Sequence, residues 1–173
     1  VVHTFFEALG HAGWRALEQS CQAAREAGLL VIGDGKRGDI DSTAAAYAQA
    51  ALDPEGPLGC DALTVNAWMG RDTLRPALQQ CRSHGRGLFV LVRTTNPGSA
   101  EHQLAGAPSG AERMAAVVAE LGQELVGPEG LSSVGAVVGC TAAAEAQRWR
   151  AAMPQAWFLV PGLGAQGGTA AQV

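Results

Sequence analysis

The stretch LLVIGDGKRGDIDST, residues 29–43, passes directly from an apolar run into a cluster of charged residues. It holds the only lysine of the chain, Lys36, between Asp34 and Asp39. A short apolar run that ends in polar residues is typical of a buried strand in a parallel sheet. The stretch therefore predicts a strand, and directly after it a loop that carries charged side chains.

The rest of the chain repeats this succession of apolar strand and helix. We expect helices over residues 5–27, 43–52, 71–83, 110–126 and 141–152, and strands over residues 29–33, 62–66, 87–93, 132–139 and 156–162. Strict alternation indicates repeated βαβ units around a parallel sheet, which is the α/β class. Because no linker of domain size interrupts the pattern, residues 1–173 are predicted to form a single domain.

Five units fit either an open doubly wound sheet or part of a closed (β/α)8 TIM barrel. A barrel normally needs about 250 residues, so this chain of 173 residues would be an incomplete barrel of about five central βα units. It would lack the first strands and the last strand and helix. Polar residues gather after the expected strand ends, at 34–36, 66, 93–96 and 162–168. Parallel α/β folds place their chemistry at that edge.

Composition excludes several classes of function. With 47% hydrophobic and 16% charged residues, the chain is globular rather than disordered. Its clean apolar runs, such as residues 88–92, are far shorter than the roughly 20 residues that cross a bilayer. A net charge of -4 with scattered arginines and few aromatic residues makes nucleic acid an unexpected partner.

The cysteines and histidines are dispersed along the chain and do not show the spacing of a metal site. We therefore expect no metal, and reduced thiols at Cys21, Cys60, Cys81 and Cys140, as in a cytoplasmic protein. The chain opens on Val1 without an initiator methionine or a signal-peptide pattern. We take this as a sign that its beginning is missing.

The spacing around Lys36 suggests a chemical role. Side chains two apart on a strand point to the same side, so Asp34 and Lys36 should emerge together, with Asp39 one turn beyond. Gly35 and Gly38 leave room for this turn. Nearby carboxylates favour the ammonium form of lysine, which suits an acid or a fixed cation. The alternative is a structural ion pair at a strand end.

The segment VIGDGKRGDIDST is similar to the signature of the orotidine 5'-phosphate decarboxylase family. The matching residues are Val31, Ile32, Asp34, Lys36, Asp39, Ile40 and Thr43. Asp41 departs from it, because the family usually has Gly, Ala or Pro there, and it adds a negative charge close to Asp39. The segments FFEALG, DALTVNAWMGRDTLRP, VLVRTTNPGSAEHQ, SSVGAVVGCT and FLVPGLGAQGG resemble the bacterial long-loop subgroup of this family over nearly the whole chain.

The resemblance implies decarboxylation of orotidine 5'-phosphate to uridine 5'-phosphate, the last step of de novo pyrimidine biosynthesis, without a cofactor. Lys36, Asp34 and Asp39 would be the catalytic residues, with Lys36 protonating a carbanion. The substrate-binding residues would be Ile40, Thr43, Thr95, Pro161 and Gln166. The partners would be a nucleotide substrate and a second copy of the chain, because Asp39 and Thr43 would reach into the site of the other subunit of a homodimer.

The same resemblance implies that parts of the site lie outside this chain. A second essential lysine and a ribose-binding aspartate are expected before Val1, and a phosphate-binding arginine is expected after Val173. A polypeptide of these residues alone should therefore be inactive. The segment 97–109, which is long and rich in small residues, is a candidate lid over the substrate.

Three other functions are compatible with parts of the sequence. Residues 162–167 have the G-x-G-x-x-G spacing of a Rossmann oxidoreductase. A magnesium-dependent sugar-phosphate decarboxylase or aldolase of the same superfamily would use the aspartates, including Asp41, as metal ligands. A non-catalytic nucleotide-binding barrel would keep the pocket without the chemistry.

Overall fold

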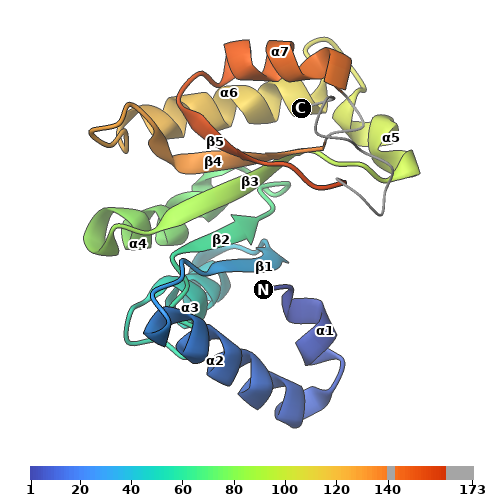
Figure 1. Ribbon diagram of the computed structural model, residues 1–173. Helices are drawn as coiled ribbons and strands as arrows, with labels where there is room; N and C mark the ends of the chain where they lie inside the picture. The colour runs from blue at the N-terminus through green and yellow to red at the C-terminus, as the bar shows by residue number, and fades with distance from the viewer. Residues whose placement is uncertain (140–142, 163–173) are drawn as a thin grey trace. The chain divides into compact units, whose positions relative to one another are not determined.

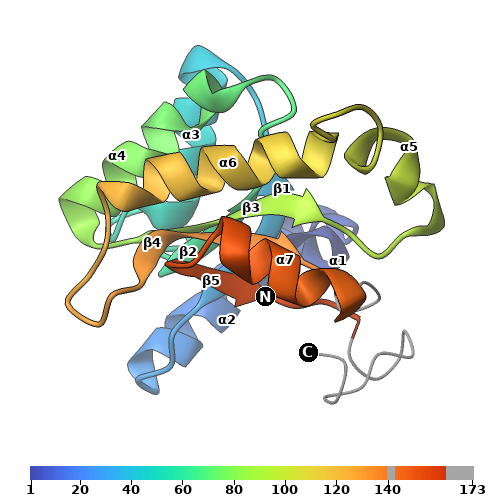
Figure 2. The ribbon, with the colours of Figure 1, turned by 90° about the horizontal axis from the view of Figure 1, so that it is seen from above.

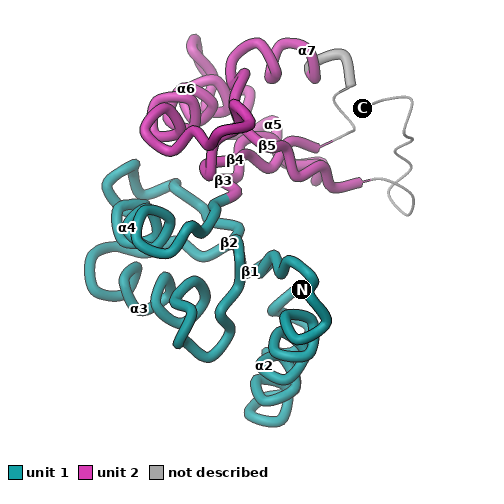
Figure 3. Tube along the Cα trace, turned by 60° about the vertical axis from the view of Figure 1, so that its left-hand side comes forward, with its two compact units in different colours: residues 1–88 teal, residues 89–173 magenta. Residues whose placement is uncertain are grey.

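The computed structural model describes residues 1–139 and 143–162 (Figure 1). The chain divides into two compact units, Val1–Leu88 and Phe89–Val173, which Figure 3 shows in different colours. In both units strands alternate with helices along the chain, which confirms the α/β class. The organisation as a single domain stays a prediction.

Unit 1 is built from two neighbouring parallel strands and the helices that precede and follow them. Its elements are α1 His3–Glu7, α2 Gly10–Glu26, β1 Ile32–Arg37, α3 Asp41–Leu52, β2 Ala62–Val65, the 3-10 helix η1 Arg71–Leu74 and α4 Arg75–His84. Strands β1 and β2 pair in parallel, and α3 packs against α4. The core of the unit includes Leu17, Leu52 and Leu63, which are at most 1% exposed. Burial of such side chains is the main favourable term in folding.

Unit 2 repeats the plan. Strand β3, Gly87–Arg93, runs into it across the unit boundary, and its other elements are η2 Pro97–Ser99, α5 Ala100–Gln103, α6 Gly110–Gln123, β4 Ser132–Val138, α7 Ala143–Ala152 and β5 Ala156–Leu159. Strands β4 and β5 pair in parallel. Helix α6 packs against β4 and α7, and α6 and α7 lie on the same side of the β4–β5 pair (Figures 1 and 2).

The predicted helix over residues 5–27 is wrong, because the chain forms two helices there. Gly10 takes a φ of 63°, which turns the chain between α1 and α2. The backbone of α1 then lies directly against α2, since a Cβ on Gly13 would stand only 1.7 Å from the carbonyl oxygen of Phe6. A periodic apolar pattern does not reveal such a reversal.

The first strand lies later in the sequence than predicted. Residues 29–33 were expected to form it, but Leu29 and Leu30 are 61% and 85% exposed, and β1 covers Ile32–Arg37. Asp34 and Lys36 are therefore part of the strand rather than of the loop after it.

The segment 97–109 is partly helical and folds against the start of α6. Ser109 and Glu112 form a capping box, in which each side chain accepts a hydrogen bond from the backbone N–H of the other. Hydrogen bonds from the Ser109 backbone and side chain lower the pKa of Glu112 to about 2. Gly110 lies so close to α5 that a Cβ there would stand 2.5 Å from the carbonyl oxygen of His102. The role of this segment as a lid stays a prediction.

None of the helices within residues 1–139 and 143–162 combines the length and apolar character that a membrane crossing needs. The described cysteines, Cys21, Cys60 and Cys81, are buried free thiols.

The Asp61 carboxylate connects the segments at the N-terminal ends of the strands in unit 1 through hydrogen bonds. Asp61, directly before β2, accepts a hydrogen bond from the backbone N–H of Val31 at 2.7 Å and from Arg86 at 2.8 Å. Its carbonyl oxygen also accepts from the N–H of Gly87 at 2.8 Å. The Asp61 side chain is 29% exposed and that of Arg86 is 15% exposed, so this ion pair is partly shielded from solvent.

We predict that Asp61→Ala lowers the free energy of unfolding of the full-length protein by about 1–3 kcal/mol, because it leaves a backbone N–H and a guanidinium without their acceptor. Urea unfolding followed by circular dichroism measures the change. Asp53→Ala is the matched control: among the described residues, the Asp53 side chain accepts a hydrogen bond from the N–H of Glu55 alone, so a change of about 0.5 kcal/mol or less is expected. Equal losses in the two variants would contradict this role of Asp61.

Candidate active site

The candidate site is built on an irregularity in the pairing of β1 with β2. Gly33 pairs with Leu63 and Arg37 with Val65. Between these pairs, β1 carries Asp34, Gly35 and Lys36 opposite the single residue Thr64. A bulge of this kind interrupts the backbone ladder and redirects side chains, and such bulges occur often beside active sites.

The bulge presents Asp34 and Lys36 to the same side, as their spacing predicts. The ammonium nitrogen of Lys36 lies 2.6 Å from Oδ1 of Asp34. Lys36 is 50% exposed and Asp34 is 24% exposed. The carboxylate is thus the more sheltered partner, while the ammonium remains accessible to a ligand.

Thr64 of β2 contacts both members of this pair. Its hydroxyl donates to Oδ1 of Asp34 at 2.8 Å and accepts from the backbone N–H of Lys36 at 2.9 Å. Burial raises the pKa of Asp34, but hydrogen bonds from Lys36 and Thr64 and the charge of Lys36 outweigh it, so the pKa lies below its usual value. Sequence reasoning missed Thr64, although it is the one polar residue of strand ALTV.

Two residues of the signature region take backbone angles that are rare outside glycine. Lys36 has a φ of 46° and Asp41 a φ of 43°. Both lie in the left-handed region, which a side chain with Cβ adopts at a cost and which aspartate tolerates better than most residues. The resemblance implies Gly, Ala or Pro at position 41. Glycine would adopt this backbone conformation without strain, whereas Asp41 adopts it at some cost.

The other face of β1 packs on α1. A Cβ on Gly33 or Gly35 would stand 2.9 Å from a ring nitrogen of His3, so both glycines are needed for the close approach of this ring. His3 is 2% exposed, and burial, followed by the charge of Arg37, lowers its pKa. Arg37 faces the same side, where it forms an ion pair with Glu7 of α1.

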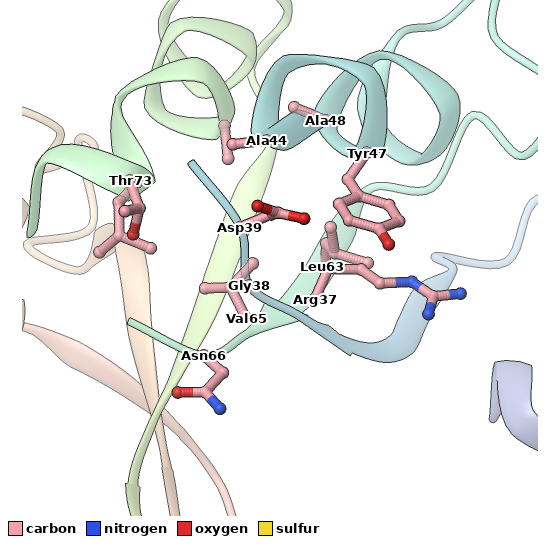
Figure 4. A pocket seen from close by; sticks show the side chains of 12 residues that line it. Arg37, Gly38, Asp39, Ala44, Tyr47, Ala48, Leu63, Val65, Asn66 and Thr73 are labelled. Atoms are coloured by element: carbon pink, nitrogen blue, oxygen red, sulfur yellow. The ribbon is translucent and has the colours of Figure 1, made fainter. Parts of the chain in front are cut away.

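Asp39 follows the end of β1, where it lies beside α3. It accepts a hydrogen bond from the N–H of Ile40 at 2.8 Å, and no ion pair between Asp39 and Lys36 is present among the described residues. Asp39 lines a cavity of about 20 Å³ together with residues of α3, β2 and η1 (Figure 4). This space is large enough for one water molecule. Ile40 and Thr43 are exposed.

The ends of β1 and β2 are joined directly. The backbone N–H of Asn66 donates to the carbonyl oxygen of Arg37 at 2.7 Å. Gly38 then passes so close to Asn66 that a Cβ would stand 2.4 Å from the Asn66 carbonyl oxygen. A glycine is therefore required at residue 38, because the backbones of residues 38 and 66 approach each other too closely for a side chain. This agrees with the expectation that Gly38 leaves room beside the turn.

In unit 2, Thr95 follows the end of β3 and is half-buried. A Cβ on Gly139, directly after β4, would stand 2.4 Å from the methyl carbon of Thr95, and the N–H of Gly139 donates to the carbonyl oxygen of Arg93 at 2.8 Å. The absence of a side chain at residue 139 thus makes room for the threonine methyl group.

Arg93, which the sequence places near the site without a role, organises the segment that follows β3. Its guanidinium donates to the hydroxyl of Ser99 at 2.6 Å and to the carbonyl oxygen of Thr94 at 2.9 Å. Gln103 of α5 accepts from the N–H of Thr94 at 2.9 Å and donates to its hydroxyl at 2.7 Å. These bonds tie α5 to the residue that precedes Thr95.

The remaining predicted residues are distributed as follows. Asp34 and Lys36 meet in unit 1, and Thr95 and the half-buried Pro161 belong to unit 2. Gln166 and most of the G-x-G-x-x-G segment lie outside the described residues. Within the described part of the chain, no cluster of three or more His, Cys, Asp or Glu side chains could hold a metal ion.

Comparison with known proteins assigns the chain to a family. The model of the orotidine 5'-phosphate decarboxylase / HUMPS family matches residues 2–173. The chain belongs to this family. It is similar to orotidine 5'-phosphate decarboxylase of Deinococcus radiodurans, with 50% identity over 167 residues, 96% of this chain and 60% of that protein. The corresponding protein of Rhodopirellula baltica is 45% identical over 175 residues, 98% of this chain and 58% of that protein.

A solved structure supports the same assignment. A candidate orotidine-monophosphate decarboxylase from Toxoplasma gondii superposes with a TM-score of 0.87 at 37% sequence identity, over 99% of this chain and 62% of that chain. The decarboxylases of this family are TIM barrels, so the prediction of a partial (β/α)8 barrel is confirmed. The chain spans about 60% of the length of the curated relatives that it matches. The Rossmann, magnesium-dependent and non-catalytic alternatives are not supported.

The low pKa of Asp34 predicts how stability depends on pH in this family member. Because the pKa is lower in the folded chain than in the unfolded chain, ionised Asp34 stabilises the fold above the unfolded value of about 3.9. That contribution is lost as the pH falls through the folded pKa. In urea unfolding of the full-length protein, wild type should therefore exceed Asp34→Asn in stability near neutral pH, and the difference should shrink as the pH falls below the unfolded value of about 3.9.

The matched control for this titration is Asp53→Asn, which removes the charge of a half-buried carboxylate in the same unit that forms no ion pair among the described residues. Its difference from wild type should stay small over the whole range. A wild-type advantage over Asp34→Asn that stayed constant or grew toward acid pH would show that Asp34 is not held in its ionised form.

Proposed function

We propose that the full-length protein decarboxylates orotidine 5'-phosphate to uridine 5'-phosphate, the last step of de novo pyrimidine biosynthesis, without a metal or organic cofactor. The observation that carries this proposal is the contact of 2.6 Å between Lys36 and Asp34 on the bulge of β1. Family membership over residues 2–173 supports the substrate class. Buried free thiols at Cys21, Cys60 and Cys81 support a location in the reducing cytoplasm.

The proposed reaction leaves a negative charge on the substrate, which a fixed ammonium group can stabilise. When the bond between the pyrimidine ring and the carboxylate breaks, carbon dioxide leaves and the electron pair stays on the ring carbon, in the plane of the ring, where no π system delocalises it. The ammonium of Lys36 stabilises this charge and then donates a proton to the carbon. A preorganised charge that acts mainly in the transition state accelerates the chemical step.

Asp34 has two roles in this mechanism. It orients Lys36 through their direct contact, and its ionised carboxylate lies beside the carboxylate of the substrate, which disfavours the ground state. The depressed pKa of Asp34 supports an ionised side chain in the working range of the enzyme. Thr95 would contact the pyrimidine, Pro161 would form a wall of the pocket, and Gln166 would approach the phosphate and the pyrimidine.

The proposal is tested by carbon dioxide release from orotidine 5'-phosphate by the full-length protein. Lys36→Ala should lower kcat/KM by roughly two to three orders of magnitude or more, as removal of a preorganised charge-stabilising donor does. Arg82→Ala is the control, since it removes an exposed cation in the last turn of α4 and should keep the wild-type rate. Equal rates in wild type and Lys36→Ala would refute the assignment of Lys36.

The proposal includes a homodimer in which Asp39, Ile40 and Thr43 complete the site of the partner subunit. The exposure of Ile40 (51%) supports this, because a large apolar side chain next to a catalytic carboxylate is otherwise left in solvent. Trp68 and Met69, which follow Asn66 in the adjoining turn, are 73% and 49% exposed. An interface over this edge of unit 1 would cover all of them.

A mixing experiment tests the shared site. Lys36→Ala and Asp39→Ala are each expected to be nearly inactive alone. After equal amounts are mixed and allowed to exchange, about a quarter of wild-type activity should return, because half of the dimers are mixed and each has one intact site. Two Lys36→Ala preparations mixed in the same way are the control. Failure of activity to return, with exchange verified by mass spectrometry, would place Asp39 in the site of its own subunit.

A further inference from the structure

The bulge in β1 leaves a backbone group that the strand ladder does not satisfy. Three residues of β1 face Thr64 alone, so the N–H of Lys36 does not find a carbonyl partner on β2. The hydroxyl oxygen of Thr64 takes that place and accepts the bond at 2.9 Å. A side chain here substitutes for the missing backbone acceptor at the residue whose φ of 46° is left-handed.

The same hydroxyl has its single proton directed at Asp34. Because the Thr64 oxygen already accepts from Lys36, its O–H is free to donate, and it does so to Oδ1 of Asp34 at 2.8 Å. Oδ1 is also the atom that contacts the Lys36 ammonium. Thr64 is 0% exposed, so water does not compete readily for either bond. One buried hydroxyl therefore holds the backbone of Lys36 and the carboxylate that orients its side chain.

We propose that Thr64 is a positioning residue of the active site, which keeps Lys36 in its left-handed backbone conformation and keeps Asp34 ionised and aligned with the ammonium. The inference rests on the proposed decarboxylase function, and it assigns to β2 a part in the catalytic apparatus. Serine or threonine is the side chain that fits this position, because each can accept from the N–H and donate to the carboxylate at the same time. Valine has the same shape and can do neither.

The charged and titratable groups that face Asp34 are few among the described residues. They are Lys36 and Arg37 on its own strand, and His3 and Glu7 of α1. Burial and the charge of Arg37 lower the pKa of His3, so His3 is neutral near pH 7. Asp34 and Glu7 are thus the two carboxylates on these facing elements, and Glu7 is paired with Arg37.

The test compares Thr64→Val with wild type in the full-length protein. The variant should lower kcat/KM for orotidine 5'-phosphate by roughly 10- to 100-fold, as expected when hydrogen bonds to a charged group are lost. The acid limb of its pH profile should move to higher pH, because removal of a donor raises the pKa of Asp34. Thr64→Ser, which keeps the hydroxyl, should retain the wild-type acid limb.

A matched control is Thr73→Val. Thr73 is a buried threonine of the same unit, and its hydroxyl donates to the carbonyl oxygen of Gly70 at 2.6 Å rather than to a group of the site. This variant loses a comparable buried hydrogen bond, so it reports the effect of general destabilisation. It should keep the wild-type acid limb even if its stability falls.

A second measurement separates this inference from the proposed function. Carbon-13 NMR of the Asp34 carboxyl, assigned with the Asp34→Asn variant, should show a higher pKa in Thr64→Val than in wild type whatever reaction the protein catalyses. Wild type that does not decarboxylate orotidine 5'-phosphate would sink the proposed function, and the titration alone would then decide the role of Thr64. An unchanged titration in Thr64→Val, or a folded Thr64→Ser with a shifted titration, would overturn the inference.

Discussion

The contact between the Lys36 ammonium and the Asp34 carboxylate is the interaction on which the site depends. An exposed ion pair of this kind contributes little to stability, because solvent screens the charges and ordering two side chains costs entropy. Here the pair stands on a strand instead of a loop, and the carboxylate is the more buried partner. In the proposed reaction its value is therefore positional, because the strand fixes where the positive charge of Lys36 would meet the negative charge that develops on the substrate.

The backbone around Lys36 departs from regular strand geometry. Lys36 has a left-handed backbone, and the ladder between β1 and β2 is interrupted. On the other face of β1, Gly33 and Gly35 let the ring of His3 lie directly on the strand. A residue keeps a strained backbone conformation only where the surrounding contacts leave it no alternative. Residues of this kind cluster at functional sites. Hydrogen bonds from Thr64 and close packing from α1 are the neighbours that do so here.

In unit 1, the stabilising contacts of Asp61 and the candidate site residues lie at opposite ends of the strands. At the N-terminal ends, Asp61 accepts hydrogen bonds from Val31 and Arg86. At the C-terminal ends, Gly38 and Asn66 bring the two backbones together beside Asp39. This division is general for barrels of parallel strands, in which the loops at the C-terminal ends carry the reactive groups.

The sequence alone determined the order of strands and helices and the pairing of Asp34 with Lys36. Apolar runs such as 87–93 and the period of two along a strand are local properties, so they can be read from neighbouring residues. The reversal at Gly10, the start of β1 at Ile32 and the part played by Thr64 were decided by tertiary structure. Each depends on which backbone lies opposite, and a threonine within an apolar strand gives no sign of the bulge that it faces. Register between strands is set by contacts between distant residues, and these exist only once the chain has folded.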